Sequence, residues 1–246
     1  MEWQEVSGNW VLTPARPKGI VHFLGGAFVA VAPHITYQRL LAPLAAIGLA
    51  IIATPYLNTF DHGAVAQDVL ERFEQAVLRL KMIHLPVYGL GHSMGVKLHL
   101  LLGSLLGVEY HGNLFLSYNN FSARRSVPLV DQFNTFLPLE FTPTPAQSNL
   151  LVQNRYLTEH NLLIRFTDDT LDETLMLAAI LQRRCLQTTI RALEGNHLTP
   201  LGPEQSWPLL ESLNPWQVGA LPLASRMQQD LLIQEICSWL EEHTYP

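Results

Sequence analysis

The sequence is poor in charge, and basic side chains are the scarcer kind. Charged residues make up 15% of the 246 positions, and 15 Lys and Arg stand against 21 Asp and Glu, so the formal net charge is −6. A protein that binds nucleic acid needs a basic stripe to neutralise phosphates, and the sequence contains none. We therefore expect no nucleic-acid partner.

Cysteine is scarce as well. The chain has two cysteines, Cys185 and Cys237, which are far apart in segments that are typical of a helix or a helix end. Zinc sites and disulfide frameworks need several cysteines at short, paired spacings. We expect two buried free thiols and no metal ion.

A nucleotide-binding loop is also missing. Gly25-Gly26 follows an apolar segment, but neither Gly-x-Gly-x-x-Gly nor Gly-Lys-Ser/Thr occurs in the chain. These are the patterns in which backbone N–H groups cradle phosphates. We expect no nucleotide and no other cofactor.

The sequence lacks an export signal and a clear membrane span. Residues 1–5 carry neither a basic nor an apolar stretch, so we expect no secretory signal and a cytoplasmic location. The uncharged stretch 40–57 approaches spanning length, but Pro43, Gly48 and Pro55 interrupt it. A helix end, a turn and a buried strand explain it better, so we expect no transmembrane segment.

Apolar residues are abundant, at 48%, and they form short strands that alternate with amphipathic helices. We expect strands at 3–6, 10–12, 19–24, 49–53, 86–90, 113–117, 162–166 and 186–193, and helices at about 34–47, 61–81, 96–106, 171–184 and 225–242. This alternation predicts a single α/β domain over residues 1–246, with a mainly parallel central sheet and helices on both faces.

Residues 119–157 interrupt the alternation. The stretch contains several prolines and its hydrophobic pattern is irregular. A connection of this length in a compact domain is usually a functional insertion, so we expect a small lid there. A second irregular stretch lies at 207–223.

The chemistry is carried by Gly91-His92-Ser93-Met94-Gly95, which lies between an apolar strand and a helix. A bare Gly-x-Ser-x-Gly arises by chance in on the order of one chain in twenty of this length, so the context matters. Between a strand and a helix the motif forms a nucleophile elbow, in which Gly91 and Gly95 leave room for the tight turn. Ser93 is the candidate nucleophile. We expect His92 to point away from it and to serve packing or substrate contact.

A serine nucleophile needs a base, and the base needs an acid. His197 follows the last strand of the predicted sheet, in a loop that returns to the edge where Ser93 lies. Asp169 follows the preceding strand and is the first choice for the acid, with Asp172 and Asp168 as alternatives. The order serine, aspartate, histidine is the chain order of α/β-hydrolases.

Two backbone N–H groups are expected to hold the oxyanion of the reaction. One belongs to Met94, at the start of the helix after Ser93. The other belongs to Gly26 or Ala27, in the small-residue loop after the strand 19–24.

The sequence resembles the α/β-hydrolase superfamily over nearly its whole length. Within that superfamily, Gly25-Gly26-Ala27-Phe28, the Gly91–Gly95 elbow and the run 166–174 are similar to a group of proteins from cyanobacteria and plastids that carry a domain of unknown function. The resemblance implies the hydrolase fold without naming a substrate. Many superfamily members have His-Gly where this chain has Leu24-Gly25.

These residues predict hydrolysis of carboxylic esters or thioesters through an acyl-enzyme on Ser93. We expect a small-molecule or lipid-like substrate with an apolar acyl group, under a roof drawn from Phe121, Phe133, Phe136, Leu137, Phe141, Trp207 and Trp216. The alternatives are an inactive binding or scaffold protein and a lyase or acyltransferase on the same fold.

Overall fold

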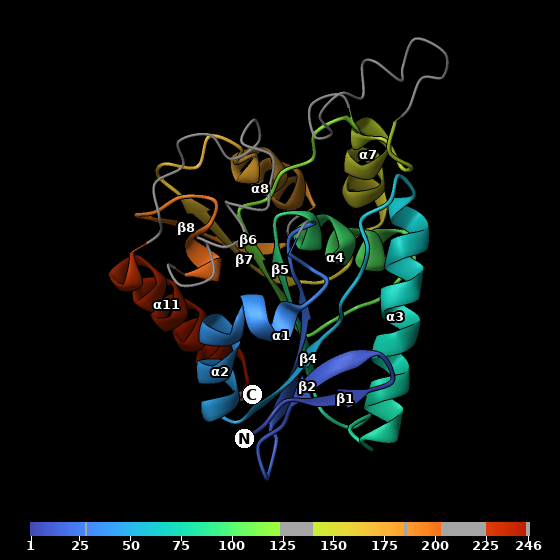
Figure 1. The fold of residues 1–246 in the computed structure, drawn as a ribbon. Helices are drawn as coiled ribbons and strands as arrows, with labels where there is room; N and C mark the ends of the chain where they lie inside the picture. Colours follow the sequence, from blue (N-terminus) through green and yellow to red (C-terminus); the bar gives the residue numbers. More distant parts are fainter. Residues whose placement is uncertain (28, 124–139, 185, 203–224, 245–246) are drawn as a thin grey trace.

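The computed structural model describes residues 1–27, 29–123, 140–184, 186–202 and 225–244 (Figure 1). One eight-stranded sheet runs through the molecule. Its strands are β1 Gln4–Val6, β2 Asn9–Leu12, β3 Gly19–Leu24, β4 Leu49–Ala53, β5 Val87–His92, β6 Gly112–Leu116, β7 His160–Phe166 and β8 Gln187–Leu193.

The strand order across the sheet is β1-β2-β4-β3-β5-β6-β7-β8. β1 and β2 form an antiparallel hairpin at one edge, and β2 pairs antiparallel with β4. Every other neighbouring pair is parallel. The carboxyl ends of β5, β7 and β8 therefore meet at the same edge of the sheet, where ligands bind in open α/β sheets.

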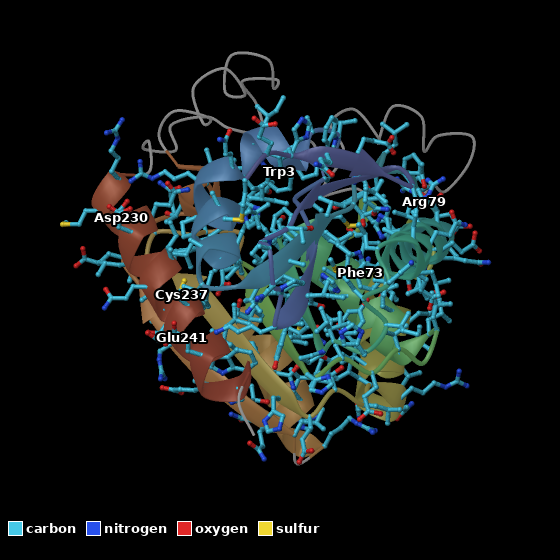
Figure 2. All side chains as sticks on the ribbon, turned by 90° about the horizontal axis from the view of Figure 1, so that it is seen from below. Trp3, Phe73, Arg79, Asp230, Cys237 and Glu241 are labelled. Carbon is cyan, nitrogen blue, oxygen red and sulfur yellow. The ribbon has the colours of Figure 1, made fainter. Side chains whose placement is uncertain are left out.

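Helices cover both faces of the sheet, as the alternation predicts. α2 Gln38–Ala46 and α11 Arg226–Thr244 pack on one face through a leucine-rich cluster. The other face is covered by α3 His62–Arg79, α4 Met94–Ser104, α7 Pro145–Arg155 and α8 Thr174–Arg183. Viewed from below, Cys237 of α11 and Phe73 of α3 lie on opposite sides of the sheet (Figure 2). The predicted α/β-hydrolase architecture is confirmed.

The described helices depart most from the sequence prediction at three places. The helix expected at 34–47 is two helices, α1 Pro33–Thr36 and α2, because the backbone leaves the helical conformation at Tyr37. α8 begins at Thr174, since the residues before it form a turn. α7 lies inside the predicted insertion, where Thr144 and Gln147 form a capping box at its start. Irregular hydrophobicity concealed that helix, although the Thr-Pro-x-Gln start was visible.

Several predicted features lie outside the described residues. They are Cys185, Phe28 and five members of the expected roof, namely Phe133, Phe136, Leu137, Trp207 and Trp216. The insertion at 119–157 stays a prediction, because residues 124–139 also lie outside the described residues. Cys237 is a half-buried free thiol, and burial raises its pKa. Within the described ranges, no helix combines the length and the apolar character needed to cross a membrane.

Candidate active site

Ser93 occupies a sharp turn between a strand and a helix. β5 ends at His92 and α4 begins at Met94, so one residue separates the two elements. Ser93 has φ 54° and ψ −116°, a conformation that residues other than glycine rarely adopt. Its N–H donates to the Leu116 carbonyl in β6 over 2.9 Å, which holds the strained turn against the neighbouring strand.

The two glycines of the turn are required by close backbone contacts. A Cβ atom on Gly91 would lie 2.7 Å from the backbone nitrogen of Val96. A Cβ atom on Gly95 would lie 2.6 Å from the carbonyl carbon of Leu24 and would overlap its oxygen. Real Cβ contacts are longer, and backbone atoms cannot swing away as a flexible side chain can. Both positions therefore exclude any larger residue for steric reasons.

The loop after β8 brings His197 to the serine. Nε2 of His197 lies 3.0 Å from Oγ of Ser93. The loop is braced internally, because the N–H of Asn196 donates to the Thr199 hydroxyl and the N–H of Leu198 donates to the side chain of Asn196. Only 12% of the His197 side chain is exposed. The imidazole is therefore held in place and is still partly accessible to solvent.

Asp169 completes the chain of hydrogen bonds. Its Oδ2 accepts from Nδ1 of His197 over 2.9 Å, and its Oδ1 accepts from the N–H of Leu171, also over 2.9 Å. One carboxylate oxygen thus forms the turn after β7, while the other faces the imidazole. Because Asp169 accepts at Nδ1, the proton of neutral His197 is placed there, and Nε2 is free to accept from the Ser93 hydroxyl.

The electrostatics of Asp169 favour its charged form. Burial alone would raise the pKa of this carboxyl, since its side chain is inaccessible to solvent. The hydrogen bond and charge of His197, together with the N–H of Leu171, outweigh burial and lower the pKa below its usual value. Asp169 is therefore ionised at neutral pH and can stabilise an imidazolium on His197.

The two alternative aspartates have other surroundings. Asp172 pairs with Arg165 over 3.3 Å and accepts from the Thr174 hydroxyl at the start of α8, and burial raises its pKa. Asp168 is exposed, and its backbone N–H donates to the Gly195 carbonyl. Among the described contacts, neither carboxylate reaches His197.

The expected oxyanion donors differ in whether their N–H groups already have a hydrogen-bond partner. Met94 is the first residue of α4, so its N–H has no partner within the helix and lies next to Ser93. The N–H of Gly26 donates to the Tyr37 hydroxyl over 2.8 Å. The expectation that Gly26 supplies a free donor is therefore wrong for this conformation. Ala27 remains as the candidate in that loop.

His92 is buried and bonded at both ring nitrogens, so of the two roles expected for it, packing and substrate contact, these contacts fit packing. Its Nδ1 lies 2.7 Å from the Tyr37 hydroxyl, and its Nε2 lies 2.9 Å from the carbonyl oxygen of His197. Burial, the largest influence, and the charge of His197 lower the pKa of His92 to about 3, so the ring is neutral. Because the His197 carbonyl can only accept, neutral His92 donates from Nε2, and its Nδ1 accepts the proton of the Tyr37 hydroxyl.

Sequence reasoning missed Asn119. Its Nδ2 lies 3.2 Å from Oγ of Ser93, on a segment that follows β6. Its position after β6 was the one indication in the sequence, because the residues after β6 reach the same sheet edge as Ser93. An asparagine in a loop gave no further sign of this contact.

Two members of the predicted aromatic roof fall within the described residues. Phe141 is 5% exposed and stacks on His62, with ring centroids 4.3 Å apart, so it packs the segment before α7 onto the start of α3. Phe121 is half-buried. A separate groove of about 780 Å³ lies between α3, α4 and α7, and Ser93 does not line it.

Comparison with known proteins identifies the fold and the family of the chain. No curated protein matches the chain in sequence. Among solved structures, TT1662 from Thermus thermophilus has a TM-score of 0.61 at 17% identity, covering 100% of this chain and 98% of that one. The fluorophosphonate-binding serine hydrolase FphF of Staphylococcus aureus has a TM-score of 0.63 at 15% identity, covering 97% and 92%.

A soluble variant of monoglyceride lipase from Saccharomyces cerevisiae, in complex with a substrate analogue, has a TM-score of 0.65 at 14% identity, covering 100% of this chain and 96% of that chain. At such identities the likeness shows the fold alone. The model of the family described as protein of unknown function (DUF1350) matches residues 2–242, and so the chain belongs to this family, which here has the α/β-hydrolase fold.

Proposed function

We propose that the protein is a serine hydrolase that cleaves carboxylic esters or thioesters with an apolar acyl group. The observation that carries the proposal is the unbroken hydrogen-bond chain from Asp169 through His197 to Ser93, with contacts of 2.9 and 3.0 Å. Its members come from three strand ends far apart in the sequence. A turn serine in a fold without chemistry has no need of this arrangement.

In the proposed reaction, Oγ of Ser93 attacks the acyl carbon and its proton passes to Nε2 of His197. The carbonyl electron pair moves onto oxygen, and its return expels the alkoxide or thiolate, which takes the proton from His197. Water then attacks the acyl-enzyme and gives a proton to His197. The acid leaves as Ser93 regains that proton. Asp169 stabilises the imidazolium in both halves.

The oxyanion is assigned to two backbone donors. Met94 supplies an N–H at the positive end of α4, and Ala27 supplies the second from the loop after β3. Gly26 serves a different role in this proposal, since its donation to Tyr37 fixes the loop that carries Ala27.

Exposed apolar side chains support an apolar substrate. Val31 and Ile35 follow β3, and Leu57 and Phe60 follow β4, at the carboxyl edge of the sheet. Their exposed fractions run from 38% to 72%, which is high for large hydrophobic residues. An acyl chain approaching Ser93 from this edge would cover part of that surface, which favours lipid-like over charged substrates.

Covalent labelling by a fluorophosphonate probe tests the proposal, because the probe reacts with an activated serine. We expect the wild-type protein to be labelled at Ser93, identified by mass spectrometry of the modified peptide. Labelling should be abolished in Ser93→Ala and strongly slowed in His197→Ala. A folded wild-type protein that is never labelled would refute the hydrolase and favour a binding or scaffold role.

Product analysis separates hydrolysis from the remaining alternative. Incubation with a short acyl ester should release the free acid at the rate at which the ester is consumed. If an added alcohol or amine captures the acyl group in preference to water, the protein is an acyltransferase on the same machinery.

A further inference from the structure

Asn119 is the one described side chain besides His197 with a recorded hydrogen bond to the Ser93 hydroxyl. The Ser93 proton points to Nε2 of His197, so a second polar neighbour of Oγ must donate to it. An asparagine can do so only through its NH2 group. The 3.2 Å contact is therefore a donation from Asn119 to the serine oxygen.

The backbone on either side of Asn119 is held by one residue, Glu173. The N–H of Glu173 donates to the Tyr118 carbonyl over 2.7 Å, and its carboxylate accepts from the Asn120 N–H, also over 2.7 Å. The Asn120 side chain donates to the Pro145 carbonyl. Both neighbours of Asn119 are buried and bonded, so its amide is presented to Ser93 from a fixed turn.

We propose that Asn119 is a further catalytic residue, which donates a hydrogen bond to Oγ of Ser93 and stabilises the negative charge that develops there as the proton leaves for His197. This inference rests on the proposed function. Before proton transfer the donation orients the hydroxyl toward the acyl carbon. During transfer the hydrogen bond strengthens, because its acceptor gains charge. The benefit therefore falls on the rate of attack and not on substrate binding.

Asn119 has a different role from the oxyanion donors. Met94 and Ala27 face the oxygen of the substrate, whereas Asn119 faces the oxygen of the enzyme. Replacing Asn119 by an isosteric carboxylate would reverse the interaction, because aspartate accepts hydrogen bonds and carries charge. A carboxylate there would also stabilise the imidazolium of His197.

The test compares Asn119→Asp, Asn119→Ala and the exposed control Asn154→Ala on α7. Fluorophosphonate labelling rates are measured from about pH 5 to 9, where histidine titrates, together with kcat and KM for a short acyl ester. Both Asn119 variants should react about ten to a hundred times more slowly, the range expected for a hydrogen bond to a charged group. KM should change little, and Asn154→Ala should match the wild type.

The pH dependence adds a readout that packing alone would not move. In Asn119→Asp the midpoint of the rate profile should shift to higher pH, whereas in Asn119→Ala the plateau should fall at an unchanged midpoint. Asn119→Asp conserves shape, so the test holds even if Asn119→Ala is poorly folded.

Labelling of Asn119→Asp within about twofold of the wild type, with an unmoved midpoint, would overturn the inference and leave the proposed hydrolase intact. A folded wild-type protein that never reacts would overturn both.

Discussion

His92 donates from Nε2 to the backbone carbonyl of His197, 2.9 Å away, so the residue before the candidate nucleophile holds the loop of the candidate base. The other ring nitrogen accepts from Tyr37, which in turn accepts from the N–H of Gly26. One buried chain of hydrogen bonds thus links the loop after β3, the elbow and the loop after β8.

Tyr37→Phe tests this chain, because it removes one hydroxyl and leaves Nδ1 of His92 and the N–H of Gly26 without partners. We expect a loss of about 1–3 kcal/mol in the free energy of unfolding, measured by chemical denaturation, because both groups are buried. Labelling of Ser93 should also slow. Tyr110→Phe is the matched control, since Tyr110 is a buried tyrosine bonded to His22 away from the site. Equal labelling rates in the two variants would contradict a positioning role for Tyr37.

Asp169→Asn tests the choice of acid. The amide can still form the turn with Leu171, but it cannot stabilise the imidazolium of His197 and favours the wrong tautomer. We expect the labelling rate to fall about 10³- to 10⁴-fold, as in other serine triads, with little change in thermal stability. Asp168→Asn is the control and should react like the wild type, because that carboxylate is exposed. If Asp168→Asn is the slower of the two, the assignment of the acid is wrong.

Gly95→Ala tests the steric basis of the elbow. The added methyl group would overlap the Leu24 carbonyl, so α4 or β3 must move, and we expect a loss of about 2–4 kcal/mol in the free energy of unfolding. Gly107→Ala is the control, since its φ is 73° and nothing lies within 4 Å of the added atom. That variant should lose only about 1 kcal/mol, from backbone strain. Similar losses in the two variants would mean that contact with Leu24 is relieved cheaply.

Stability should fall steeply in mild acid. Burial, the largest cause, lowers the pKa of His62, His92 and His99 to about 3 in the folded protein. The unfolded chain binds these protons below about pH 6.5, so the stabilisation is complete above that pH and is lost as the pH falls toward 3. Each histidine contributes a slope of about 1.4 kcal/mol per pH unit in this window.

Urea unfolding at several pH values between about 7 and 5 measures the combined slope. His99→Gln removes one titrating group that lies away from Ser93, and its slope should be shallower by about one histidine's share. Asp169, whose pKa is lowered, adds a loss in the same direction at still lower pH. A stability that does not change over this range would show that the buried rings become protonated without unfolding.

The exposed apolar edge gives a prediction for substrate choice. Replacing Leu57 and Phe60 by serine should lower kcat/KM for long acyl esters about three- to tenfold and leave short esters nearly unchanged, because only a long chain covers these residues. Leu78→Ser is the control, since Leu78 is 62% exposed near the C-terminal end of α3. Equal losses for long and short chains would contradict the proposed apolar contact.

The sequence predicts the sheet and the order of the site residues because both are local patterns repeated along the chain. Apolar strands alternate with amphipathic helices, and Ser93, Asp169 and His197 each follow a strand. Parallel strands carry such residues to one edge whatever the details of packing. The sequence ranks Asp169 first, but only the structure shows that its carboxylate, and not that of the nearby Asp168 or Asp172, bonds to His197.

Other contacts between distant segments could not be predicted from the sequence. The sequence predicts that Tyr37 lies inside a helix. In the structure it lies between two short helices and bonds to Gly26 and His92. The contact of Asn119 with Ser93 likewise depends on how Glu173 holds the turn after β6. Such contacts depend on tertiary packing, which leaves no periodic trace in the sequence.

During evolution, folding constrains the elbow glycines, whereas catalysis constrains the acid Asp169. Gly91 and Gly95 are needed by any chain that folds this way, because a side chain at either place meets backbone atoms. A descendant that abandoned catalysis would keep both glycines. Position 169 is different, because asparagine serves its turn as well as aspartate does and only a working base requires the charge. Among relatives, the residue at position 169 should therefore distinguish active enzymes from inactive homologues better than the glycine motif does.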